Sequence, residues 1–233
     1  MCDQTNGVQL ILYLFLGPET LYMRDGTAPP SHSTVKEGFF NFRRINPAPF
    51  TAFEFIRPLT MGQYPSVMIP AAAYAMVFLF DNILFTLEIP QLYAEKFGFN
   101  AEQIGLQFLG IIIGSVIGEQ LGGRLSDAWM GRRAKRLGEG QRPAPEYRLW
   151  LSYFGYACAL VGPIIFLVQL DNAKQGAWNI TPIIGAAIGA AGNQLITTVL
   201  ITYAVDCYPD QSASVGVFIS FVRQTWGFLG PFW

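Results

Sequence analysis

Asp81 is an acidic residue inside an otherwise apolar stretch, where its carboxyl group could exchange protons or bind a solute. It follows 23 residues without a formal charge, from Pro58 to Phe80. Tyr74 and Glu88 lie seven residues to either side, so a regular α-helix would place all three on one face. Tyr74 and Asp81 are therefore candidate pathway residues. Glu88 joins them as a candidate, although its place near the end of the stretch leaves solvation as the alternative.

Three further polar residues are candidates because their surroundings are apolar. Arg223 lies 11 residues beyond Ser212, where a C-terminal apolar stretch begins. It could line the same solute or proton pathway, or form a structural ion pair with Asp81. Asn193 and Gln194 could bind a solute, but hydrogen bonds between helices are the favoured interpretation.

A basic patch follows a glycine-rich apolar segment. Residues 109–136 read LGIIIGSVIGEQLGGRLSDAWMGRRAKR. We expect Asp127 to pair with Arg132 and Arg133, since such a charge cluster can be made in one conformational state and broken in another. A solvated basic loop is the alternative. The net charge of −1 and the lack of interleaved aromatic residues argue against a nucleic-acid partner.

The composition identifies the class of protein that must position these residues. The 233-residue chain is 52% hydrophobic and only 13% charged, whereas a typical soluble domain has about 25% charged residues. Lipid offers no hydrogen bonds to the backbone, so spanning segments must be helices or a closed barrel. The sequence lacks strand-like alternation. We therefore predict an all-α membrane protein with the lipid bilayer as its surroundings.

Apolar stretches of spanning length define the expected helices, since a span needs about 20 residues. Four full spans are expected at 66–92, 103–123, 149–170 and 179–205. A further, partial span is expected at 212–233, which completes a helical bundle from 66 to 233. Residues 1–24 are interpreted as the tail of a truncated transmembrane helix and 25–65 as a cytoplasmic linker. The bundle is accordingly expected to be incomplete at both ends.

The connections predict the orientation in the membrane. Lys and Arg number five in 17–65 and seven in 124–148, but only one each in 93–102 and 171–178. Because Lys and Arg collect in cytoplasmic connections, the first two should be cytoplasmic and the other two external.

Glycine spacing predicts where helices approach closely, because small residues drive helix contact in membranes. One stripe consists of Gly110, Gly114, Gly118 and Gly122. A second runs through Gly185 and Gly189 to Gly192 and Asn193, and a third through Gly216, Ser220 and Gly227.

The basic patch also resembles a known family motif. The run from Gly123 to Asp127, followed by Gly131, Arg132 and Arg133, is similar to the cytoplasmic loop motif of the major facilitator superfamily. The runs GPETLYMR, EIPQLYAEKFGF, YAVDCYPDQ and FVRQTWGFLGPFW resemble fungal members of its drug:proton antiporter branch. The resemblance implies the C-terminal half of the fold, with Gly123, Asp127, Gly131, Arg132 and Arg133 as a cytoplasmic gate.

That resemblance implies a secondary active transporter for a drug or another small solute, with proton coupling. The alternative is a truncated, non-transporting membrane protein or a structural partner of a full-length relative. The missing transporter half or a second copy of the chain would be the protein partner. The plasma membrane is favoured over an internal membrane.

Several kinds of chemistry have no support in the sequence. His32 is the single histidine, and the three cysteines lack metal-ligand spacing. No phosphate-binding glycine loop is present. We therefore expect no metal, no cofactor and no enzymatic activity.

Overall fold

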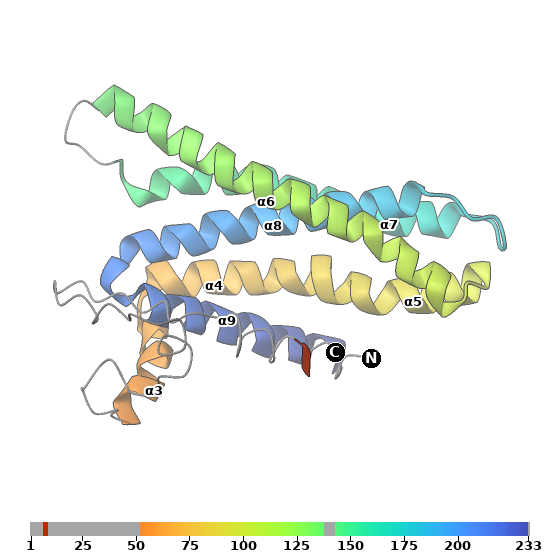
Figure 1. Cartoon of the computed structure of the whole chain (residues 1–233), viewed down its shortest axis with the longest axis horizontal. Helices are drawn as coiled ribbons and strands as arrows, with labels where there is room; N and C mark the ends of the chain where they lie inside the picture. The colour runs from red at the N-terminus through yellow and green to blue at the C-terminus, as the bar shows by residue number, and fades with distance from the viewer. Residues whose placement is uncertain (1–6, 9–51, 138–142, 233) are drawn as a thin grey trace, which may run out of the picture. The chain divides into compact units, whose positions relative to one another are not determined.

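The computed structural model describes residues 7–8, 52–137 and 143–232, and from residue 52 onward these belong to one unit. The expected helix tail at 1–24 and most of the linker at 25–65 lie outside the described residues. The main helices of this unit are α3 (Ala52–Thr60), α4 (Pro65–Phe78), η2 (Leu79–Ile83), α5 (Leu84–Phe97), α6 (Ala101–Leu137), η3 (Pro145–Leu151), α7 (Ser152–Asn172), α8 (Thr181–Cys207) and α9 (Ser212–Leu229). The described residues contain no strand (Figure 1).

Four of the described helical segments are long and apolar enough to cross a membrane. They cover Pro65–Phe97, Ala101–Leu137, Pro145–Asn172 and Thr181–Cys207. This confirms the predicted all-α membrane fold and its four full spans. The shorter α9 packs against α4.

Local sequence explains where several helices begin and end. Pro65 starts α4, and a proline fits the first helical position because its missing N–H would be unpaired there. Gly98 ends α5 in the left-handed conformation at φ 66°, which glycine adopts without a steric penalty. At the start of α6, the Gln103 backbone N–H donates to Asn100 Oδ1 at 2.9 Å, and the Asn100 N–H donates to Gln103 Oε1 at 3.1 Å.

Helix α8 is the most buried of the four spanning segments, and α6 and α7 make their largest contacts with it. Two glycine faces permit this. On α6, a Cβ added to Gly114 would lie 2.1 Å from the carbonyl oxygen of Ala187, and one added to Gly118 would lie 2.3 Å from that of Ala191. Gly110 and Gly122 continue this face against Ile183 and Leu195 of α8.

The opposite side of α8 meets α7 through a second set of glycines. A Cβ on Gly185 would lie 2.6 Å from the Phe166 nitrogen, and one on Gly192 would lie 2.6 Å from the Ala159 nitrogen. Gly189 contacts two elements: a Cβ added to Gly162 of α7 would lie 2.3 Å from the Gly189 nitrogen, and a Cβ added to Gly189 itself would lie 2.7 Å from Asp81 Oδ1. The glycines of α8 therefore allow close contact with both α7 and η2.

The basic patch is helical, which corrects the expectation of a loop after residue 123. Helix α6 continues to Leu137. Trp129 fixes this extension: its Nε1–H donates to the Tyr147 carbonyl at 3.2 Å, and the two rings stack with centroids 5.5 Å apart. The polar end of α6 thus stays helical beyond the apolar span because Trp129 packs on Tyr147 of η3.

The third glycine stripe was wrongly predicted as one packing face. No atom of the described residues lies within 4 Å of a Cβ added to Gly216, and Ser220 is exposed. Only Gly227 is in a close contact, 3.2 Å from the Phe78 ring. Helix α9 meets α4 through larger buried residues, including Val215, Phe218 and Ile219.

We expect Gly114→Ala to destabilise the α6–α8 contact by about 1–3 kcal/mol, because its methyl group would overlap backbone atoms that cannot rotate away. Gly123→Ala is the matched control, since nothing lies within 4 Å of its added Cβ. Alanine should be neutral or stabilising there, by up to about 1 kcal/mol. Unfolding in detergent measures both variants. Equal effects would contradict the assigned contact.

Candidate functional site

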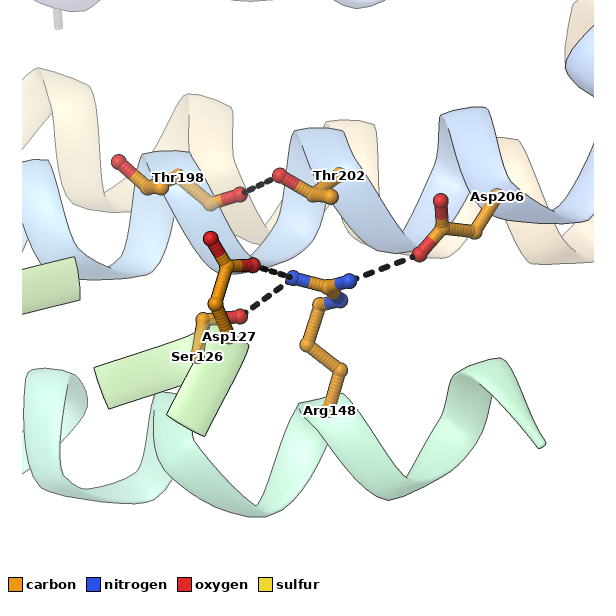
Figure 2. A network of polar contacts seen from close by, with 6 residues as sticks. All are labelled: Ser126, Asp127, Arg148, Thr198, Thr202 and Asp206. Atoms are coloured by element: carbon orange, nitrogen blue, oxygen red, sulfur yellow. Dashed lines mark hydrogen bonds and ion pairs between the residues drawn. The ribbon is translucent and has the colours of Figure 1, made fainter. Parts of the chain in front are cut away.

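Arg148 links three helical segments at one end of the bundle. Its Nη2 lies 3.1 Å from Oδ2 of Asp206, near the end of α8. Its Nη1 lies 3.6 Å from Oδ1 of Asp127 on α6 and donates to Ser126 Oγ at 2.5 Å. We call Ser126, Asp127, Arg148 and Asp206 the Arg148 cluster, and Figure 2 shows the guanidinium between the two carboxylates.

The two ion pairs of the cluster differ in their surroundings. The Arg148 side chain is 11% exposed, whereas that of Asp206 is 38% exposed and that of Asp127 is 82% exposed. The Asp127 pair is long and largely solvated, so it contributes little energy. The shorter Asp206 pair is better shielded from solvent. Of its two ion pairs, the one with Asp206 is therefore firm and the one with Asp127 is easily broken.

In the structure Asp127 pairs with Arg148 and not with the predicted Arg132 or Arg133. Arg132 and Arg133 follow Asp127 by five and six residues on the continuous helix α6, whereas residues on the same helix meet at a spacing of three or four. Arg133 instead lies over the Tyr147 ring, with its Cζ 5.2 Å from the centroid. Arg132 is exposed, and Gly123 and Gly131 have no atom within 4 Å of an added Cβ.

Arg148, Ser126 and Asp206 were not among the site residues predicted from the sequence. Arg148 was counted only among the basic residues of the connection 124–148. Two signals were available. Arg148 directly precedes the apolar run at 149–170, and the connection with Asp206 carries two acidic residues but no Lys or Arg. Only a cation from another segment could therefore balance the charge of these two acidic residues.

Asp81 lies in a π-helical turn, η2, between α4 and α5. Its residue is 2% exposed, and Oδ1 has no hydrogen-bond partner among the described residues. Tyr74, earlier in the same spanning segment, belongs to one buried apolar cluster, and Phe85, later in it, belongs to another. A π turn often marks a functional position in a helix. The turn thus presents a carboxyl group to the small-residue face of α8 at Gly189.

The π turn also changes the expected alignment of Tyr74, Asp81 and Glu88. A π turn holds more residues than a regular α-helical turn, so a spacing of seven no longer returns to one face. Tyr74 and Asp81 are buried, whereas Glu88 is half-buried beside the buried Ile89. Glu88 is therefore more exposed than the other two candidates.

Asn193 and Gln194 have different environments on α8. Asn193 is 3% exposed, and its Oδ1 has no hydrogen-bond partner among the described residues. Gln194 Nε2 lies 3.4 Å from Glu119 Oε2 on α6, and Thr198 Oγ1 lies 3.4 Å from the same oxygen. At that length these are weak interhelical contacts.

Arg223 does not pair with Asp81 in the described part of the chain, where Arg148 supplies the cation of each ion pair. Its Nη1 instead donates to the Tyr74 hydroxyl at 2.9 Å. Its Cζ lies 4.8 Å from the Phe78 ring centroid and 5.6 Å from that of Tyr74. Arg223 and Tyr74 are thus brought together, while Asp81 faces α8.

We expect Gly189→Ala to displace the Asp81 carboxyl group, because the new Cβ would lie 2.7 Å from Oδ1. The expected loss of unfolding free energy is about 1–2 kcal/mol. It should shrink in the Asp81→Ala background, where the clashing oxygen is gone. A double-mutant cycle on the purified protein measures this coupling. Strict additivity would show that the two residues do not touch.

The four apolar helices of spanning length define an integral, multi-pass membrane protein. Similarity to known proteins then identifies the family. The chain is 33% identical over 140 residues to the probable efflux pump mfs2 of Aspergillus flavus, covering 60% of this chain and 32% of that protein. It is 30% identical to the MFS-type transporter penM of Penicillium rubens, covering 77% and 34%. The chain belongs to the major facilitator superfamily.

A third relative extends the similarity along almost the whole chain. The MFS-type transporter hepF of Aspergillus oryzae is 26% identical, with 97% of this chain and 46% of that protein covered. The chain thus spans less than half the length of each of these three relatives. No family model and no solved structure matches it.

Proposed function

We propose that the chain forms part of a secondary active transporter that moves a small solute across a membrane by alternating access. The Arg148 cluster is the observation that supports this most. It joins three helical segments at one end of the bundle through contacts of unequal strength. Such a contact can be closed in one state and open in another, as a gate requires.

We further propose that proton coupling depends on Asp81. Asp81 is buried, and its Oδ1 has no hydrogen-bond partner among the described residues. Gain or loss of a proton would therefore strongly change the energy of the charge inside the apolar segment. Asp81 lies in η2, within the same spanning segment as α4 and α5, so helix motion would alter its access to water. Efflux is the proposed direction, because the relative mfs2 is named as a probable efflux pump. The plasma membrane is the proposed location.

Solute efflux from yeast cells tests this proposal, with the chain expressed as part of a full-length transporter. The cells should lack their own efflux pumps and be loaded with fluorescent solutes of different charge. At least one solute should leave faster than from cells with an empty vector, and a protonophore should abolish the difference. If no solute leaves faster although the protein reaches the plasma membrane, the transport proposal fails and the non-transporting alternative is favoured.

A further inference from the structure

Arg223 is a permanent cation within the bundle that lacks a carboxylate partner in the described chain. It lies in α9, which packs against α4, and it is half-buried. Each ion pair of the described residues belongs to Arg148. The guanidinium group cannot lose its proton in a protein, so its charge has to be balanced by other means. In apolar surroundings an unbalanced cation is costly.

The contacts that Arg223 does make leave hydrogen-bonding capacity unused. A guanidinium group has five N–H donors. One nitrogen, Nη1, donates to the Tyr74 hydroxyl at 2.9 Å, while the buried Nε has no partner among the described residues. The rings of Phe78 and Tyr74 attract the cation through their π faces but accept no conventional hydrogen bonds. Among the described residues no partner takes the donors of Nη2 or the second donor of Nη1, whereas Nε is buried.

Asp81 is not positioned to supply the missing charge. Its Oδ1 is directed at Gly189 on α8, whereas Arg223 reaches α4 from α9 through Tyr74. Tyr74 accepts a hydrogen bond from the guanidinium group, and the Phe78 ring lies against it. Gly227 packs closely on the Phe78 ring, since a Cβ added there would lie 3.2 Å from it. This arrangement fixes the orientation of the cation without neutralising it.

We infer that Arg223, with Tyr74 and Phe78, binds the carboxylate of an organic acid that has an aromatic body. The inference rests on the proposed function, since it names the class of solute that such a transporter would take. The planar fork of arginine matches a carboxylate through two parallel hydrogen bonds. The half-buried ring of Phe78 offers apolar surface to the rest of the solute, while the buried Tyr74 orients the guanidinium group.

Binding of benzoate to the purified protein in nanodiscs of zwitterionic lipid tests this inference. Saturation-transfer NMR reports binding, and benzamide serves as the neutral probe of the same shape. We expect saturable benzoate binding and no competition by benzamide. Arg223→Gln should weaken benzoate binding by about tenfold or more, the loss expected for hydrogen bonds to a charged group. Lys174→Gln, in the exposed connection before α8, is the matched control and should leave binding unchanged.

Arg223→Lys keeps the inference testable if Arg223→Gln does not fold. It retains the charge but not the fork, so benzoate should bind more weakly than to the wild type. Equal benzoate binding by a folded Arg223 variant, or equal binding of benzamide, would overturn the inference. So would the absence of saturable benzoate binding by the folded wild-type protein. Protonophore-sensitive efflux of cationic or neutral solutes would then still support transport, so the two failures are distinguishable.

Discussion

Asp81→Asn should abolish gradient-driven transport while the protein still folds and binds its solute. Asparagine has nearly the same shape as aspartate but cannot gain and lose a proton. Asp81 is 2% exposed and its Oδ1 has no partner among the described residues, so the substitution removes no hydrogen bond at that atom. Flux into vesicles that contain the full-length transporter, with an imposed proton gradient, measures the effect. We expect it to fall to the background rate, with solute exchange preserved.

Glu95→Gln is the matched control for this substitution, because Glu95 is an exposed acidic residue on α5 of the same spanning segment. Its transport rate should equal that of the wild type. Normal gradient-driven transport by a well-expressed Asp81→Asn variant would remove Asp81 from the mechanism. A structural ion pair would behave differently: Asp81→Asn would then lower the folded yield, and Arg223→Gln would restore it. The separate contacts of Asp81 and Arg223 argue against that outcome.

Arg148→Gln should destabilise the end of the bundle where α6, η3 and α8 meet. The substitution leaves two carboxylates without their shared cation. It also removes the Nη1–H group that donates to Ser126 Oγ. Removing one partner of a buried pair costs about 3–5 kcal/mol. Asp127 is 82% exposed, so its share is small. We expect a net loss of about 2–3 kcal/mol, most of it from the Asp206 contact.

Unfolding of the purified protein in detergent compares this variant with Arg132→Gln. Arg132 is exposed on the same basic helix and takes part in neither ion pair, so its loss should cost less than about 0.5 kcal/mol. Asp206→Asn should cost more than Asp127→Asn, because the Asp206 contact is shorter and less exposed. Equal stability of Arg148→Gln and Arg132→Gln would show that the Arg148 cluster does not stabilise the bundle.

Hydropathy and glycine spacing predicted the parts of the fold that depend on short-range patterns. Continuous apolar runs specify spanning helices, and glycines four residues apart specify close helix contacts, as at Gly114 and Gly118. The end of α6 was missed because its last residues are polar. Their helix is stabilised by a contact with Tyr147, which depends on how η3 folds back.

The candidate site depends on features that residue spacing does not encode. The π turn at Asp81 shifts every later residue relative to Tyr74, and no residue type in LFDNI requires such a turn. The partner of Asp127 could not be chosen from sequence distance, since Arg148 is 21 positions away and Arg132 only five. The structure determines which cation reaches the carboxylate, because α6 stays helical and turns Arg132 away.

The distance between the ends of α6 and α8 tests most directly whether the Arg148 cluster is a gate. Spin labels at Arg132→Cys and Asp210→Cys, both exposed positions, would report it in a background without native cysteines. Double electron–electron resonance in nanodiscs should give two distances in the wild type. The longer one should gain population in Arg148→Gln. A single distance that is the same in both proteins would contradict the gate.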